Sequence, residues 1–257
     1  MHAYTRGRHE HGQNFLTDRS VIDSIVDEVA RTTGPIIEIG PGDGSLTRPL
    51  SRLDRHLIGV EVDSRQAARL APTLPAGTTI VTTDFLGYRL PRDPHVVVGN
   101  LPFHLTTAIL RRLLRAPGWT HAVLLTQWEV ARRRAGVGGS SMMTAQWAPW
   151  FEFALSCRVP RAAFRPKPGV DGGLLVMRRR NRPLLSGRDR KQYQGLVHRV
   201  FTGPGRGLSP ILHRAGCFRT SGTARAWLRR AGLRPDGLPK DLRTEHWIEL
   251  YAMSMNP

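Results

Sequence analysis

The sequence predicts a doubly wound α/β domain, with a mostly parallel sheet and an antiparallel edge, followed by a small all-α C-terminal domain. Three observations support this fold class. Short apolar runs alternate with helical patterns, a glycine-rich turn follows the first of these runs, and β-branched runs cease after residue 182. We therefore expect a flexible basic tail at 1–12, the α/β domain at 13–182 and the helical domain at 183–257.

The first helix is expected to begin after Thr17, which we take as its N-cap. Apolar residues then recur at helical spacing, and this pattern delivers the chain to the first strand. The repeating positions are Val21, Ile22, Ile25, Val26 and Val29.

Continuous Val, Ile and Leu runs separated by helical patterns indicate a parallel sheet that is covered on both faces. The last two expected strands are joined by a Pro- and Arg-containing loop, Arg161 to Val170, instead of a helix, which favours an antiparallel edge. The expected strands are Pro35 to Gly40, His56 to Asp63, Thr78 to Asp84, His95 to Asn100, His121 to Gln127, Phe151 to Val159 and Gly172 to Arg178.

Helical patterns with glycine-rich turns between them fill the C-terminal domain. The expected helices are Arg188 to Phe201, Leu208 to Cys217, Thr223 to Ala231 and Asp241 to Met253.

The charge of the chain predicts a polyanionic partner. The 257 residues carry 38 Lys and Arg against 20 Asp and Glu, a formal net charge of +18, and such a charge raises affinity for phosphate backbones. Coding with a high GC content would explain why lysine occurs only at Lys167, Lys191 and Lys240, but it does not explain the excess over acidic residues.

Neither a metal site, nor a disulfide framework, nor a membrane segment is expected. Cys157 and Cys217 lie far apart without metal-ligand spacing, and none of the histidines has such a spacing. No apolar run reaches the roughly eighteen residues of a membrane helix, and the N-terminus is polar, unlike a signal peptide. We expect a cytoplasmic protein.

A cofactor site is predicted at the end of the first strand. Glu38 to Gly44 runs from this strand into a GxGxG turn, where glycines allow a tight turn and close approach of a ligand. Glu61 ends the second strand and can bind both hydroxyls of a ribose. Asp84 ends the third and is suitably placed for an adenine amino group.

A glycine-rich turn alone would often be a packing feature. Here the glycine-rich turn, Glu61 and Asp84 follow one another at the ends of successive strands. Open α/β sheets bind ligands outside the carboxyl ends of their strands, so the three features indicate one binding crevice. Neither a Walker lysine nor the GxGxxG spacing of dinucleotide folds is present. S-adenosylmethionine is therefore a better candidate cofactor than ATP or NAD.

The stretch Gly99 to His104 predicts an acceptor site for a flat ring that carries an amine. The side-chain oxygen of Asn100 and the main-chain carbonyl of Leu101 can accept the two N–H bonds of an adenine N6 and direct its lone pair. Pro102 removes a competing donor, and Phe103 can stack on the ring. Phe103 could also be a packing residue, and His104 is the one histidine beside this pocket.

Five motifs, in this order and spacing, resemble the rRNA adenine N6-methyltransferases over about the whole chain. This superfamily includes the Erm enzymes, which act on 23S rRNA, and the KsgA group, which acts on the small subunit. The segment Val200 to Leu208 and the Leu-Thr-Thr that follows His104 are more similar to the Erm branch, whereas Phe164 to Asp171 fits both. The five motifs are Gly12 to Leu16, Glu38 to Gly44, Gly59 to Asp63, Thr83 to Phe85 and Asn100 to Phe103.

The resemblance implies a Rossmann-like methyltransferase domain and assigns residues to the cofactor. Asn14 and Leu16 would cover the methionine end of S-adenosylmethionine, and Asn100 would border both cofactor and target. The residues implied to bind the cofactor are Asn14, Leu16, Gly40, Gly42, Glu61, Val62, Asp84 and Asn100, and those implied at the reacting base are Asn100, Leu101, Pro102 and Phe103.

Several basic residues are candidates for contacts with the RNA backbone. Arg111 and Arg112 lie on a helical pattern, and they could equally well belong to a helix face that only contacts solvent. Trp128, Trp147 and Trp150 are expected to be packing residues. The candidate RNA contacts are Arg111, Arg112, Arg132, Arg133, Arg134, Arg165 and Lys167.

The predicted function is transfer of a methyl group from S-adenosylmethionine to N6 of a flipped adenine in 23S rRNA. It implies resistance to macrolide, lincosamide and streptogramin antibiotics, and a monomer that acts before ribosome assembly is complete. Two alternatives stay open: a KsgA-type dimethyltransferase of small-subunit rRNA, and a non-catalytic RNA-binding or transcription factor that keeps the fold.

Overall fold

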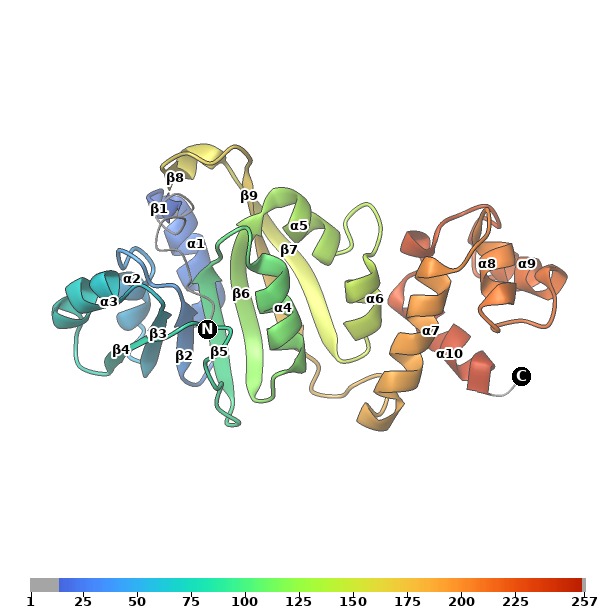
Figure 1. Ribbon diagram of the computed structural model, residues 1–257, viewed down its shortest axis with the longest axis horizontal. Coiled ribbons are helices and arrows are strands. Elements are labelled where there is room, and N and C mark those ends of the chain that lie inside the picture. Colours follow the sequence, from blue (N-terminus) through green and yellow to red (C-terminus); the bar gives the residue numbers. More distant parts are fainter. Residues whose placement is uncertain (1–13, 256–257) are drawn as a thin grey trace, which may run out of the picture. The chain divides into compact units, whose positions relative to one another are not determined.

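The computed structural model describes residues 14–255, and the expected tail at 1–12 lies outside them. The described chain forms two compact units (Figure 1). The first contains the residues up to Ala131 together with Leu155–Arg178. The second contains Arg132–Ala154 together with the residues from Arg179 onward. None of the described helices is long and apolar enough to cross a membrane.

A seven-stranded sheet has the strand order β4-β3-β2-β5-β6-β9-β7. The pairs β2–β3, β3–β4, β2–β5 and β5–β6 are parallel, and β6–β9 is antiparallel. This confirms the predicted mostly parallel sheet with an antiparallel edge. The strands are β2 (Ile36–Ile39), β3 (Leu57–Glu61), β4 (Thr78–Thr82), β5 (His95–Asn100), β6 (Trp119–Gln127), β7 (Phe151–Val159) and β9 (Gly172–Arg179).

The order of the strands reverses between β2 and β5. From β2 the chain continues outward to β3 and β4, and it then returns to β5 on the other side of β2. In open α/β sheets such a switch point opens a crevice at the carboxyl ends of the two central strands. Here those ends are Ile39, followed by the glycine turn, and Asn100.

The central strands are apolar throughout because both of their faces are covered. All four residues of β2 are buried, as are the first five of β5. Helix α1 (Arg19–Ala30) places Val21, Ile25 and Val29 in one core cluster with residues of β2, β5 and β6. The other helices of this unit are α2 (Thr47–Ser51), α3 (Ser64–Leu70) and α4 (Thr106–Arg115), and α5 (Trp128–Arg134) begins in it.

Two local predictions were wrong. The N-cap of α1 is Asp18, whose carboxylate accepts from the amides of Ser20 (2.9 Å) and Val21 (3.3 Å). Thr17 instead donates its hydroxyl to the carbonyl of Ala163. The third expected strand ends at Thr82, so that Asp84 lies in the loop beyond it, where its Oδ1 accepts the amide of Leu86.

A small antiparallel pair was not predicted. β1 (Phe15–Leu16) pairs with β8 (Phe164–Arg165), with Phe15 opposite Arg165 and Leu16 opposite Phe164. β8 lies in the segment that we expected to be a loop, directly after a 3₁₀ turn at Arg161–Ala163. This pair holds the segment that follows residue 13 against the loop between β7 and β9.

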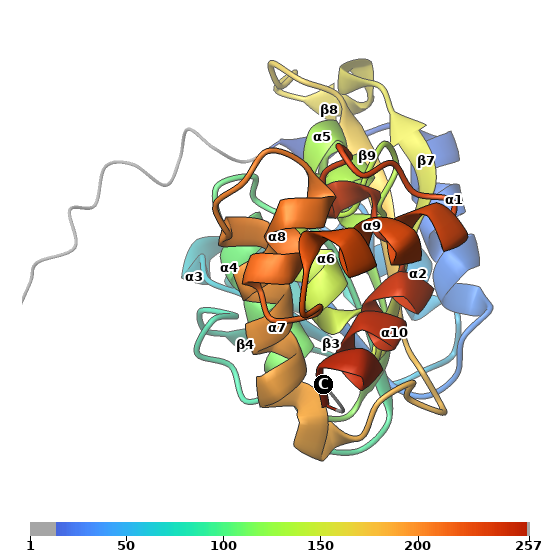
Figure 2. The ribbon, with the colours of Figure 1, turned by 90° about the vertical axis from the view of Figure 1, so that its right-hand side faces the viewer.

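The second unit is helical, and α8 and α9 lie side by side in it (Figure 2). It includes residues 132–154, which we had placed in the domain at 13–182. These residues pack with the C-terminal helices, since the Tyr193 hydroxyl donates to the carbonyl of Ala145 (2.8 Å) and its ring meets that of Trp150. Its helices are α6 (Met142–Trp147), α7 (Arg190–Thr202), α8 (Leu208–Arg214), α9 (Ser221–Arg230) and α10 (Thr244–Met255).

Candidate active site

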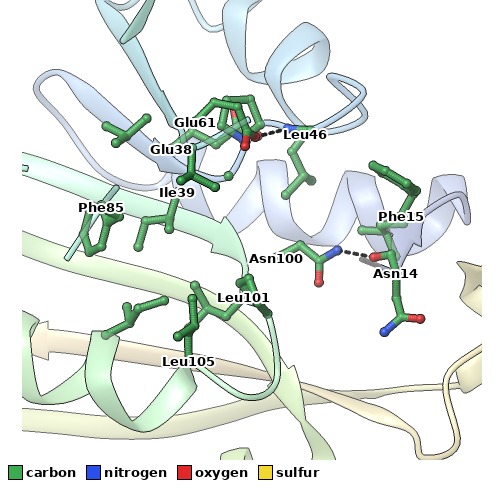
Figure 3. A pocket seen from close by; sticks show the side chains of 18 of the residues that line it. Asn14, Phe15, Glu38, Ile39, Leu46, Glu61, Phe85, Asn100, Leu101 and Leu105 are labelled. Carbon is green, nitrogen blue, oxygen red and sulfur yellow. Dashed lines mark hydrogen bonds between the residues drawn. The ribbon is translucent and has the colours of Figure 1, made fainter. Parts of the chain in front are cut away.

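One pocket in the first unit collects the residues that the sequence analysis assigned to cofactor and target (Figure 3). It lies at the carboxyl ends of β2, β3 and β5, and the segment around β1 forms another of its walls. The pocket brings together two sets of predicted residues, whose individual roles stay predictions. The sets are Asn14, Leu16, Gly40, Gly42, Glu61, Val62 and Asp84 for the cofactor, and Asn100, Leu101, Pro102 and Phe103 for the target.

The three glycines of the turn after β2 serve different purposes. Gly40, Gly42 and Gly44 all have positive φ angles, of 64°, 56° and 84°. A Cβ on Gly40 would point into open space, whereas one on Gly44 would come within 2.5 Å of a side-chain carbon of Leu70. The wall of the pocket is therefore open at Gly40, whereas a side chain at Gly44 would have to displace Leu70 and would be strained by the positive φ angle.

The Glu61 carboxylate joins the glycine turn to the end of β3. Its Oε2 accepts the amide of Gly42 and its Oε1 accepts the amide of Asp63, both at 2.9 Å. The residue is 3% exposed. These bonds fix the direction of the carboxylate, and each oxygen keeps a further lone pair for a hydroxyl group of a ligand.

Glu38 is a buried acid in the pocket wall that the sequence analysis quoted in its motif but did not assign to the site. Burial raises its pKa to about 8, the neighbouring Thr47 hydroxyl opposes this rise, and the charges of Glu61 and Asp43 add to it. Its Oε2 has no hydrogen-bond partner among the residues that the structure describes. Its position one residue before the end of β2 was the available signal.

The part of the pocket near β3 has an apolar wall. Val62 is 62% exposed although it lines the pocket, and buried Phe85 lies next to Asp84. Phe15, which was not predicted as a site residue, lies beside the turn, because a Cβ on Gly42 would be 3.2 Å from its ring. An exposed apolar side chain beside a buried ring is a suitable surface for a flat heterocycle.

Asn100 ends β5 and faces the segment around β1. Its Nδ2 donates to the main-chain carbonyl of Asn14 at 2.8 Å, and Figure 3 shows the amide oxygen directed away from Asn14. This bond distinguishes the two ends of the amide, so that the oxygen stays available as an acceptor. Gly99 is required just before it, because a Cβ there would lie 2.8 Å from the Ile39 carbonyl oxygen of β2.

The loop after Asn100 is anchored through its backbone. The amide of Leu101 donates to the carbonyl of Leu125 in β6 at 2.9 Å, and the carbonyl of Pro102 accepts the amide of Leu105 at 2.9 Å. Within residues 14–255 we find no donor to the carbonyl of Leu101. Phe103 is half-buried and His104 is exposed. The Asn100 side chain and the Leu101 carbonyl are therefore two neighbouring free acceptors at the pocket.

The candidate RNA contacts differ in their surroundings. Arg112 is half-buried, donates to the carbonyl of Tyr88 and lies 6.0 Å from the centre of the ring of Phe85, which lines the pocket. Arg134 donates to the Ser141 hydroxyl and, like Arg132, is half-buried. The exposed members of the set are Arg111, Arg133, Arg165 and Lys167.

Comparison with known proteins is consistent with this geometry. Residues 4–253 match the family described as "Ribosomal RNA adenine dimethylase". The chain is 61% identical to an rRNA adenine N-6-methyltransferase of Corynebacterium diphtheriae over 219 residues. These aligned residues are 85% of this chain and 87% of that protein. It is 49% identical over 251 residues to the mycinamicin-resistance protein MyrB of Micromonospora griseorubida, covering 96% of this chain and 79% of the other.

A solved structure has the same fold throughout. The crystal structure of the 23S rRNA methyltransferase ErmE matches with a TM-score of 0.85 and 34% sequence identity, over 95% of this chain and all of that one. The predicted Rossmann-like methyltransferase fold with a helical C-terminal region is thereby confirmed.

Proposed function

Because this chain belongs to the ribosomal RNA adenine dimethylase family, we propose that it transfers a methyl group from S-adenosylmethionine to the exocyclic N6 of an adenine in 23S rRNA. The observation that carries this proposal is the pair of free acceptors at Asn100 and Leu101 in the pocket that also contains the glycine turn and Glu61.

The groups that line the pocket suit S-adenosylmethionine. Glu61 would hold the ribose hydroxyls with its remaining lone pairs, and Val62 and Phe85 would enclose the adenine ring beside Asp84. The open space at Gly40 is where the ligand would approach the backbone. When bound there, the cofactor supplies a methyl group on a positively charged sulfur.

The acceptors would solve the main chemical difficulty of the reaction. The lone pair of an adenine amine is delocalised into its ring, which makes the amine a weak nucleophile. The Asn100 oxygen and the Leu101 carbonyl would bind the two N6 hydrogens and so favour a pyramidal nitrogen whose lone pair faces the methyl group. Most of the acceleration would then come from orientation. No strong general base is required, because the methylated nitrogen is cationic and would release its extra proton to water after the transfer.

The target base would have to leave its stack to reach this pocket. Flipping costs a few kcal/mol and is least costly in a loop or bulge, so a structured RNA with an irregular segment is the expected substrate. Stacking on Phe103 would return roughly 1–3 kcal/mol. The half-buried state of Phe103 is consistent with a ring that has a face available.

The large-subunit target and the antibiotic resistance follow from the relatives. ErmE is named as a 23S rRNA methyltransferase and MyrB as a mycinamicin-resistance protein, and both match more than nine tenths of this chain. We propose that this protein acts in the cytoplasm as a monomer on 23S rRNA before ribosome assembly is complete. Its expression in a sensitive bacterium should then raise resistance to macrolides, lincosamides and streptogramins.

The test is methyl transfer to three substrates: protein-free 23S rRNA, protein-free 16S rRNA and assembled large subunits. The proposal expects transfer to the free 23S rRNA alone, with mass spectrometry of the product locating a methylated adenine. Transfer to the small-subunit RNA instead would move the protein to the KsgA branch. A protein that fails to bind S-adenosylmethionine in calorimetry would support the non-catalytic RNA-binding alternative.

A further inference from the structure

Two buried threonine hydroxyls lie directly behind the loop that presents the target acceptors. Thr106 is the first residue of α4 and is 1% exposed, and Thr126 belongs to β6 and is fully buried. Their Oγ1 atoms are 3.0 Å apart. Thr106 belongs to the Leu-Thr-Thr segment that is similar to the Erm branch, but no role was predicted for it or for Thr126, and neither lines the pocket itself.

Each threonine hydroxyl has a single hydrogen to donate, which limits the direction of these hydrogen bonds. The Thr106 hydroxyl donates to the carbonyl of Pro102 at 3.4 Å. Either hydroxyl could donate in the 3.0 Å contact, and the arrangement that keeps the Thr106 hydrogen on the Pro102 carbonyl has Thr126 as the donor. The result is a chain that runs from the Thr126 hydroxyl through Thr106 to the peptide bond between Pro102 and Phe103.

The same part of β6 also holds the other side of the loop. Leu125, next to Thr126, accepts the amide of Leu101 at 2.9 Å. Two consecutive residues of β6 therefore contact the loop, Leu125 at the Leu101 amide and Thr126, through Thr106, at the Pro102 carbonyl, which also accepts the amide of Leu105 at 2.9 Å. The carbonyl that lies between these two anchored groups is that of Leu101, the proposed acceptor for N6.

We propose that Thr106 and Thr126 are positioning residues for methyl transfer. They hold the Pro102 peptide so that the Leu101 carbonyl and the Phe103 ring face the target adenine. The inference rests on the proposed function, because it requires the Asn100 to Phe103 loop to bind the target. An alternative is that the two buried hydroxyls only satisfy each other, in which case their loss would lower stability and leave the reaction unaffected.

The variants Thr106→Val and Thr126→Val test the proposal, because valine keeps the shape of threonine and removes the hydroxyl. We expect kcat on 23S rRNA to fall at least tenfold in Thr106→Val, since small misplacements in an active site are costly. A smaller fall is expected in Thr126→Val, and Thr106→Ser should recover most of the activity. The Kd of S-adenosylmethionine should stay within twofold of wild type in all three variants.

Thr120→Val is the matched control. Thr120 lies at the other end of β6, and its hydroxyl donates to the carbonyl of His95 at 3.2 Å, away from the loop. This variant should lose a similar amount of thermal stability and keep the wild-type kcat. The double variant Thr106→Val with Thr126→Val should be no slower than Thr106→Val alone, because both hydroxyls act through the same carbonyl.

The proposal is overturned if both valine variants keep the wild-type kcat at a temperature where they are folded. If Thr106→Val does not fold, the comparison of Thr126→Val with Thr126→Ser decides, and equal kcat values in this pair and in wild type contradict the inference. A wild-type protein without any methyl transfer would contradict the proposed function instead, which separates the two failures.

Discussion

Asn100 is the residue at which the two halves of the site meet. Its amide nitrogen donates to the carbonyl of Asn14, and its amide oxygen stays available as the acceptor that we propose for the target. We expect Asn100→Ala to lower kcat about 100-fold or more, because one of two aligned acceptors is lost. Binding of S-adenosylmethionine should largely survive, since the glycine turn and Glu61 are unchanged. Single-turnover methyl transfer and calorimetry measure the two quantities.

Asn100→Asp is the informative companion variant. It keeps an oxygen that can accept from N6 but cannot donate to the Asn14 carbonyl. Intermediate activity is expected because the acceptor remains while its orientation is lost. If the alanine variant were as active as wild type, the acceptor role of Asn100 would be wrong.

The buried carboxyl of Glu38 should make the free energy of unfolding depend on pH. Burial raises its folded pKa from about 4.5 to about 8, so the folded state holds a proton that the unfolded state has released between these values. The contribution of Glu38 to the free energy of unfolding therefore falls as the pH rises from about 4.5 to 8, by at most about 1.4 kcal/mol per pH unit. Glu38→Gln, which cannot ionise, removes this dependence.

The measurement is urea unfolding of wild type and Glu38→Gln at pH 5.5 and pH 8.5, without cofactor. The variant should gain stability relative to wild type at the higher pH, since all other titrating groups are shared. A difference between the two proteins that is the same at both pH values would show that Glu38 does not hold the extra proton.

Residues of the pocket could be predicted where a side chain follows a strand in a recognisable motif. Glu61, Asp84 and Asn100 were found in this way and all line the pocket. Glu38 was not, because it lies inside β2, one residue before the strand ends, and in this way roles were assigned only to side chains at or beyond a strand end. Phe15 was missed because its approach to Gly42 depends on a contact between distant segments.

At the scale of elements, the apolar runs predicted the strands well because the central sheet is buried on both faces. The bounds of β5 and β7 were predicted to the residue. The pair β1–β8 was not predicted, since two-residue strands are too short to show a period of two, and their pairing joins positions almost 150 residues apart. The wrong N-cap at Thr17 has a similar origin, because its hydroxyl is used by the distant Ala163.

β2 and β5 approach each other closely at the switch in the sheet. A Cβ at position 99 would lie 2.8 Å from the carbonyl oxygen and 3.0 Å from the Cβ of Ile39. We expect Gly99→Ala to lower the free energy of unfolding by about 1–3 kcal/mol, because neighbouring backbones would have to separate. Chemical denaturation followed by circular dichroism measures this change.

Gly187→Ala provides the control for that measurement. A Cβ there meets no atom within 4 Å, and the residue has no positive φ angle. Its stability should stay within about 0.5 kcal/mol of wild type, as for most surface substitutions. If Gly99→Ala and Gly187→Ala lowered the free energy of unfolding equally, the close approach of β2 and β5 would not be the reason for glycine at position 99.

At the scale of the whole molecule, charge is distributed more unevenly than the composition alone indicates. Residues 190–235, which include α7, α8 and α9, contain no Asp or Glu. Arg225 and Arg229 are one turn apart on α9 and exposed, opposite its buried Trp227. In the part of the chain that the structure describes, no carboxylate lies within ion-pairing distance of either. Our candidate RNA contacts did not include them, because a charge pattern does not reveal which arginines are paired.

We expect the double variant Arg225→Gln, Arg229→Gln to bind 23S rRNA more weakly than wild type. The matched control is Arg234→Gln, Arg243→Gln, which removes the same net charge from exposed arginines of the same unit that are paired with Asp236 (2.7 Å) and Glu245 (2.8 Å). Each lost phosphate contact should reduce the slope of log affinity against log salt concentration by about one. A slope reduced equally in both double variants would mean that net charge, and not this face of α9, determines the affinity. A slope reduced only in Arg225→Gln, Arg229→Gln would show that RNA phosphates contact the second unit. The excess of arginine would then hold the RNA, while the pocket of the first unit would receive the target base.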